Sequence, residues 1–154
     1  MKTSFIVILL CTFVFLVSLD SCKKDETGKG SVTSGYGGTQ SHNVGEACMS
    51  CHNSGGSNKY WFTVAGTVYK PDSTDLNPNG TVYLFSAPSG SGTMTYSFQV
   101  DGKANFFTTD PASFGNGLYP AVKSLSGQVK YMNSFITQGN CNSCHNKGNR
   151  IVVN

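Results

Sequence analysis

The residues best suited to chemistry form a five-residue pattern that occurs twice in the chain. The first copy is Cys48-Met49-Ser50-Cys51-His52, and the second is Cys141-Asn142-Ser143-Cys144-His145. Each copy joins two thiols, which form covalent or metal bonds, to an imidazole, whose ring nitrogen is a common metal ligand. Every cysteine after Cys22 belongs to one of these copies. The two copies therefore predict the same chemistry at two places.

Cys-x-x-Cys-His is the pattern that attaches c-type haem covalently. Each thiol forms a thioether with a haem vinyl group, and the adjacent histidine supplies an axial nitrogen to the iron. On these two motifs the chain resembles dihaem c-type cytochromes. The resemblance implies two covalently bound haem c groups, with thioethers at Cys48, Cys51, Cys141 and Cys144 and proximal axial ligands at His52 and His145.

Three other uses of the cysteines compete with haem. Paired Cys-x-x-Cys units are common zinc ligands, so the four thiols suit a structural zinc site. An oxidising compartment would also allow two disulfides. A thioredoxin-like redox motif requires a βαβ setting, which this sequence does not show. Only haem uses both histidines as well as all four cysteines, and we therefore favour it.

The chain has too few histidines to supply both axial ligands of two irons, since four are needed and it has three. The third, His42, precedes the first motif in a stretch that resembles segments of multihaem cytochromes, where such a histidine binds iron. We expect it to serve a neighbouring haem more readily than its own. Met132 is the best candidate for the other iron, with an ordinary sheet methionine as the equal alternative. Met94 ranks third. Met49 is not an expected distal ligand, because it lies inside the first motif, on the same side of the haem as the proximal histidine.

The first 21 residues predict an export signal. A short positive start is followed by an apolar run over 5–17, which is too short to span a bilayer. Leu19-Asp20-Ser21-Cys22 resembles a lipoprotein signal, which implies lipidation of Cys22. Residues 22–26 also resemble the lysine/acid stretch of surface-exported lipoproteins. The alternative is an ordinary signal peptide with an incidental cysteine. The resemblance implies an exported, lipid-anchored protein, most simply at the periplasmic or surface face of an outer membrane.

Residues 22–41 are expected to form a flexible tether. The stretch 27–41 is rich in Gly, Ser and Thr, and such a composition buries too little apolar surface to order itself. A linker of this length reaches about 25 Å. The body is expected to span residues 42–154. The whole chain carries 11 Lys and Arg against 8 Asp and Glu, without a basic run. Nucleic acid is therefore not an expected partner.

The body is expected to be mainly β. Frequent turn residues separate short alternating or β-branched runs, and Asp101-Gly102 is a strong hairpin signal. These features predict a small antiparallel β-sandwich at about 60–135, flanked by the two Cys-x-x-Cys-His loop segments. The expected strands cover 60–69, 81–86, 95–100, 104–109, 118–122 and 128–132, with a closing strand at 151–153.

The middle of the chain also resembles transthyretin-like, carboxypeptidase-regulatory domains. The resemblance is carried by Val64-Ala65-Gly66-Thr67-Val68-Tyr69, Gly80-Thr81-Val82-Tyr83-Leu84 and Asp101-Gly102-Lys103-Ala104-Asn105-Phe106, and it spans about 62–135. It implies a scaffold and does not fix a function.

The sequence as a whole predicts electron transfer by a membrane-anchored dihaem cytochrome, with redox proteins of an extracytoplasmic electron chain as partners. It shows no Ser/His/Asp set or paired carboxylates, so we do not expect an enzyme. Two alternatives stay open. One is a sensor or peroxidase-like enzyme with an open iron, and the other is an extracellular binding module with zinc or disulfides at the Cys-x-x-Cys pairs.

Overall fold

Short strands and almost no helix make up the protein in the computed structural model, which describes residues 30–56 and 58–154. Residues 31–154 form one unit. Its helical turns are η1 (Cys48–Ser50), η2 (Pro88–Gly90) and α2 (Cys141–Cys144). Its strands are β1 (Val64–Tyr69), β2 (Thr81–Phe85), β3 (Met94–Gln99), β4 (Asn105–Thr108), β5 (Tyr119–Lys123), β6 (Val129–Tyr131), β7 (Gly139–Asn140) and β8 (Ile151–Val152).

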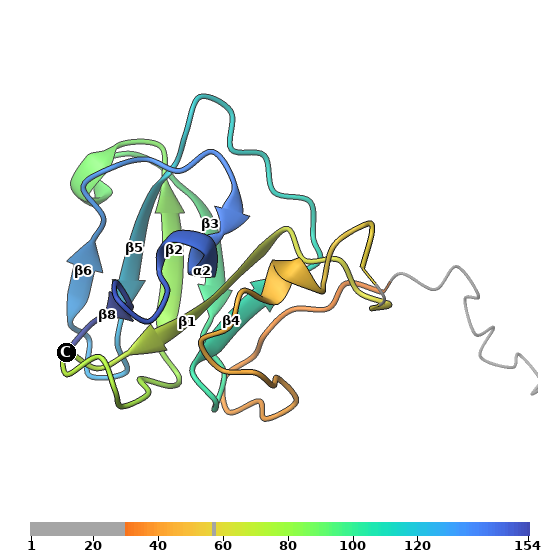
Figure 1. Ribbon diagram of the computed structural model, residues 1–154. Coiled ribbons are helices and arrows are strands. Elements are labelled where there is room, and N and C mark those ends of the chain that lie inside the picture. The colour runs from red at the N-terminus through yellow and green to blue at the C-terminus, as the bar shows by residue number, and fades with distance from the viewer. Residues whose placement is uncertain (1–29, 57) are drawn as a thin grey trace, which may run out of the picture. The chain divides into compact units, whose positions relative to one another are not determined.

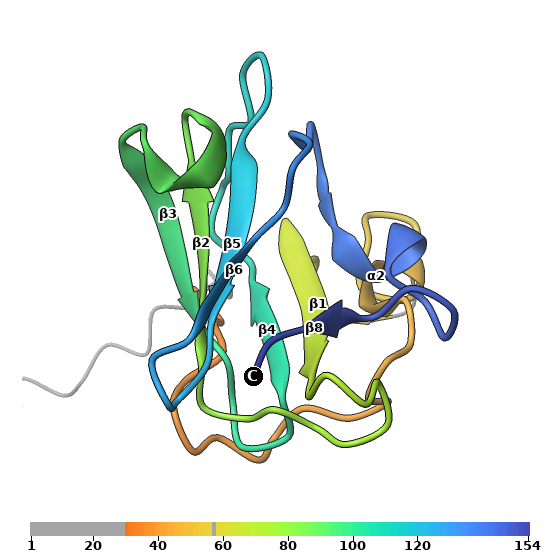
Figure 2. The same cartoon turned by 90° about the vertical axis from the view of Figure 1, so that its left-hand side faces the viewer.

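The strands form two four-stranded sheets (Figure 1). One sheet has the order β3-β2-β5-β6 and is antiparallel throughout. The other is mixed, because β1 pairs with β4 in antiparallel fashion and with both β7 and β8 in parallel. The expected mainly β class and two-sheet arrangement are confirmed, but only one sheet is antiparallel. Figure 2 shows the two sheets as separate layers, with α2 beside β1.

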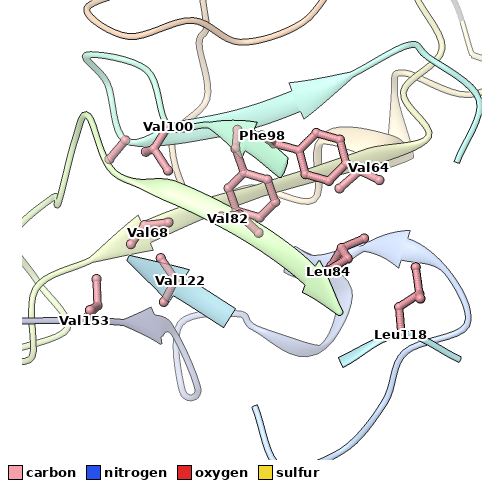
Figure 3. Packing of buried hydrophobic residues seen from close by; sticks show 11 residues of the cluster. Val64, Val68, Val82, Leu84, Phe98, Val100, Leu118, Val122 and Val153 are labelled. Atoms are coloured by element: carbon pink, nitrogen blue, oxygen red, sulfur yellow. The ribbon is translucent and has the colours of Figure 1, made fainter. Parts of the chain in front are cut away.

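The hydrophobic core lies between the sheets (Figure 3). On β2 the alternation of buried Val82 and Leu84 with half-exposed neighbours is the pattern of a strand that buries one face. All six residues of β1 are buried. Its side chains at positions 64 and 68 enter the core, and the polar side chain of Thr67 binds the segment around the first motif on the other face. β1 is therefore covered on both sides.

The turn at Asp101-Gly102 does not close a hairpin, and that prediction was wrong. β3 pairs with β2 and β4 pairs with β1, so the turn carries the chain from one sheet to the other. The buried Asp101 carboxylate explains the geometry, because Oδ1 accepts hydrogen bonds from the amides of Lys103 and Asn105, each at 2.9 Å. Ala104 adopts a positive φ of 64° inside this turn. The wider turn separates the two strands.

The expected strands are present with small shifts, and one strand was missed. The first begins at Val64 rather than at residue 60. The missed strand is β7, whose two residues pair in parallel with Val64 and Ala65. It has no alternation or β-branched residue to reveal it. It matters because the second motif begins at the next residue, Cys141.

Part of the segment predicted as a tether lies along the edge of β4. Val32 donates to the Thr109 hydroxyl at 2.9 Å and accepts from the Thr109 amide at 2.9 Å. The amide of Ser34 donates to the Phe107 carbonyl at 2.9 Å. The chain is thus held against the mixed sheet before it reaches His42.

Gly66 of β1 has no room for a side chain. A Cβ there would lie 2.4 Å from Cζ of Phe106 and 3.0 Å from Cβ of Cys141. We expect Gly66→Ala to lower the free energy of unfolding by about 1–3 kcal/mol, because the added methyl group forces neighbouring side chains or backbone out of their packed positions. Thermal and urea denaturation of the haem-free chain measure this loss. Gly35→Ala is the matched control, because a Cβ at Gly35 meets nothing within 4 Å. Equal stability of the two variants would contradict the prediction.

Candidate functional site

Each motif folds into a single tight turn with the same internal hydrogen bond. In the first, the amide of His52 donates to the Cys48 carbonyl at 2.9 Å. In the second, the amide of His145 donates to the Cys141 carbonyl, also at 2.9 Å. A helical turn brings residues three apart to the same side. The two thiols of each motif therefore share one side of their turn.

The histidines that close the motifs are oriented alike. Nδ1 of His52 lies 2.9 Å from the Tyr60 carbonyl oxygen, and Nδ1 of His145 lies 2.8 Å from the Asn149 carbonyl oxygen. Because a carbonyl only accepts, Nδ1 carries the proton in both rings and donates it. The lone pair is then on Nε2 of each ring. Metal-binding histidines are commonly fixed by such a backbone bond from the other nitrogen.

The four motif cysteines are free thiols. Cys51 and Cys144 are exposed, whereas Cys48 and Cys141 are partly buried. Burial raises the pKa of the Cys48 thiol, and burial together with the nearby Cys48 and Cys144 sulfurs raises the pKa of Cys141 to about 12. Cys141 is therefore a protonated thiol at neutral pH in the haem-free chain.

The second motif lies between two strands on the same edge of β1. β7 ends at Asn140, where it pairs with Ala65, and β8 begins at Ile151, where it pairs with Val68. Residues 141–150 leave the sheet between these two pairings. Both ends of the loop are therefore fixed by the central strand.

A buried amide joins the two motifs through β1. Nδ2 of Asn142 donates to the Glu46 carbonyl at 2.7 Å, just before the first motif, and to the Thr67 hydroxyl at 3.2 Å. Its Oδ1 accepts from the Thr67 amide at 3.2 Å. The Thr67 hydroxyl donates in turn to Oδ1 of Asn105 at 2.6 Å and accepts from the amide of Gly45 at 3.1 Å. The network holds the two turns next to each other, although 88 residues of sequence, 53–140, separate the motifs.

His42 lies beside His52, with ring centroids 5.8 Å apart and ring planes inclined by 44°. The His52 ring also stacks on the Phe62 ring, with centroids 4.2 Å apart. Phe62 stacks in turn on Phe107, with centroids 4.9 Å apart. The predicted distal ligand and the first proximal ligand are thus neighbours. Phe62 is thus the aromatic residue that lies against the first motif histidine.

An apolar cleft of about 430 Å³ adjoins the second motif. Its lining includes Cys141, Cys144 and His145, and also Met132, the other predicted distal ligand. Met94 is half exposed on β3 and is not part of this lining. The structure therefore brings Met132 and the second motif to one cavity and leaves Met94 elsewhere.

Residues 30–56 and 58–154 include the four motif cysteines and the three histidines of the chain. All four motif thiols are free. No group of three or more His, Cys, Asp or Glu side chains in these ranges is arranged to hold a metal ion.

The predicted signal segment and the lipidation residue Cys22 lie outside the described residues. Within the part that is described, no helix is long and apolar enough to span a membrane.

Sequence reasoning missed the residues that position the motifs. Asn142 occupies a variable position of Cys-x-x-Cys-His, and Thr67 resembles any strand threonine. Their partners are 96 and 38 residues away along the chain. Only the fold identifies them. Phe62 had a sequence signal, because it belongs to the aromatic run Tyr60-Trp61-Phe62 that follows the first motif.

Comparisons of the chain with protein-family models, with curated proteins and with solved structures found no match.

Removing the Asn142 amide is expected to loosen the contact between the motifs. Asn142→Ala deletes three hydrogen bonds and leaves the Thr67 amide without its acceptor, which costs about 2–3 kcal/mol of unfolding free energy. Urea denaturation of the haem-free chain measures this loss. Ser143→Ala is the control, because its exposed hydroxyl reaches the Asn140 carbonyl and the Cys144 sulfur and takes no part in the Asn142 network. A loss no larger than that of the control would show that the network does not hold the turns.

Proposed function

We propose that this protein is an electron-transfer protein, a c-type cytochrome that holds two covalently attached haems. The observation that carries the proposal is the common state of the two motif histidines. Each donates its Nδ1 proton to a backbone carbonyl and keeps its Nε2 lone pair for a metal. A zinc site of four cysteines, or a pair of disulfides, gives no reason for two histidines in the same fixed tautomer.

The thiols fit covalent attachment as well. All four are free, and each pair lies on one side of a single turn with its histidine next to it. When bound, haem supplies a one-electron Fe(III)/Fe(II) couple. The chain holds the two attachment turns against each other through Asn142 and the Glu46 carbonyl. Short separation between redox groups favours electron exchange, and this contact supports transfer within one chain.

The position of His42 supports an assignment that the sequence did not favour. Metal–imidazole bonds are about 2 Å long, so two imidazoles on opposite sides of one iron have ring centroids about 6 Å apart. The His42 and His52 rings are 5.8 Å apart. We therefore assign His42 to the iron of its own motif. Met132 is the soft donor in the lining shared with His145, and a Met/His pair has a higher reduction potential than a bis-histidine pair.

A second candidate function is binding of a small ligand at an open iron. The histidine count favours it, since His42 and His52 together leave His145 as the one remaining histidine of the chain. If Met132 does not bind, the second iron has a free axial position. The spin state of the oxidised protein separates this sensor or peroxidase-like function from electron transfer, because an open site gives a high-spin haem.

Export and anchoring complete the proposal. Covalent attachment of haem c takes place outside the cytoplasm, where the predicted signal segment directs the chain. Lipidation at Cys22 would hold the body at a membrane surface, the outer membrane in the simplest case. Redox proteins of an extracytoplasmic electron chain are the proposed partners.

Haem content tests the function directly. Expressed with a cytochrome c maturation system, the wild-type chain is expected to carry two covalent haems, and Cys51→Ser and Cys144→Ser are expected to carry one each. The pyridine haemochrome spectrum, with intact mass, measures the stoichiometry. Ser50→Ala and Ser143→Ala are matched controls inside the motifs and should retain both haems. Absence of covalent haem from the wild-type chain would reject the cytochrome and favour the binding-module alternative.

The assignment of His42 is tested in chains that hold one haem. With Cys141→Ser and Cys144→Ser removing the second group, His42→Ala is expected to convert a low-spin spectrum to a high-spin one, and added imidazole should restore it. With Cys48→Ser and Cys51→Ser instead, the same change should leave the spectrum as it was. Electron paramagnetic resonance reads both cases. An effect confined to the second haem would assign His42 to the other iron.

A further inference from the structure

The cleft beside the second motif is lined by residues of both sheets. Val64 and Phe106 of the mixed sheet line it, as do Leu84 and Val122 of the antiparallel sheet. These four residues also belong to the hydrophobic core. The cleft therefore reaches down to the hydrophobic core, although these four side chains are themselves buried. Cavities of about 300–1,000 Å³ with apolar walls are the usual size for bound organic groups, and the cleft measures about 430 Å³.

The charges of the lining select the kind of group. Its charged side chains are Lys130 and Arg150, and no carboxylate belongs to it. The guanidinium of Arg150 lies 4.1 Å above the ring of Tyr69 and donates to the Ser73 carbonyl. Asn140, also in the lining, has a buried Oδ1 without a hydrogen-bond partner among the described residues. A flat apolar group with carboxyl substituents complements both the walls and the charges.

The histidines of the two motifs lie on different sides of the mixed sheet, whereas the turns themselves meet at β1 through Asn142 and Thr67. Cys141, Cys144 and His145 line the cleft, whereas no residue of the first motif does. Phe107, at the end of the ring stack from His52, follows Phe106 on β4, and successive residues of a strand point to opposite faces. Phe106 lines the cleft, so the stack beside His52 lies on the other face.

We propose that the porphyrin attached at Cys141 and Cys144 occupies the cleft between the sheets, with its propionates beside Lys130 and Arg150. The porphyrin of the first motif remains on the opposite face of the mixed sheet. This inference rests on the proposed function and adds the location of each group. It also gives β6 a role. The three residues of β6 are exposed, and Lys130 and Tyr131 line the cleft. The inserted group covers this strand.

Hydrogen exchange on single-haem chains tests the location. The Cys48→Ser/Cys51→Ser chain keeps only the second haem, and its amides over β6 and the following segment 132–138 should exchange about tenfold more slowly than in the Cys141→Ser/Cys144→Ser chain. The latter chain is the matched control, because it holds one haem on the other face. Mass spectrometry of peptic fragments reads the rates for both.

The outcomes separate this inference from the proposed function. If neither chain carries haem by the pyridine haemochrome assay, the function itself fails. If both carry haem but residues 129–138 exchange equally in the two chains, the function stands and the second porphyrin does not occupy the cleft. Slower exchange over this segment in the chain with the first haem would also overturn the location.

The charges give a second measurement. In the chain that keeps the second haem, Lys130→Gln/Arg150→Gln should lower the midpoint potential, because positive charges stabilise the reduced state. Lys123→Gln is the control, since Lys123 is an exposed cation of neighbouring β5 that does not line the cleft. Spectroelectrochemical titration measures both. An equal shift in the control would remove the role of the two cations.

Discussion

The amide of Asn142 is the contact on which the arrangement of the candidate site depends. It is buried, and it binds the central strand at Thr67 and the approach to the first motif at Glu46. A buried amide is costly unless its hydrogen bonds are made, so the second turn is stable only in the position that satisfies it. The two motifs are far apart in sequence, and this one side chain determines where they meet.

Strand β1 makes that contact available. A strand buried on both faces presents side chains to the core and, in alternation, to whatever lies outside the sheet. Val64 and Val68 serve the core, while Thr67 receives the hydrogen bonds of the motifs. Gly66 lets Cys141 approach closely. The same short strand thus supports the core and the turns of both motifs, which is why overpacking at Gly66 and loss of Asn142 are expected to weaken the protein through different contacts.

Local sequence predicts much of the β content, because a strand such as β2 alternates apolar residues, here Val82 and Leu84, with residues that face outward. It predicts the chemistry of the cysteines and histidines for a similar reason, since Cys-x-x-Cys-His is a local pattern. It does not predict pairings. The turn at Asp101 resembles a hairpin turn, yet its buried carboxylate holds a wider turn that crosses between sheets. β7 is a strand only through its pairing with β1, which local sequence does not show. The approach of His42 to His52 likewise depends on how residues 42–52 fold over the mixed sheet.

On the proposed function, three histidines for two irons allow at most one bis-histidine centre within a chain. The structure divides the donors: His42 adjoins His52, whereas Met132 shares a lining with His145. On the proposed function, one centre is bis-histidine on one face of the sheet and the other is set among apolar side chains. Burial and a thioether ligand both raise a haem potential relative to an exposed bis-histidine centre. With these ligands, electrons would favour the second centre, and such a carrier would accept an electron at the first haem and hold it at the second. If the second iron had a free axial position, the same difference in reduction potential would let the first haem supply electrons to a ligand bound at the second.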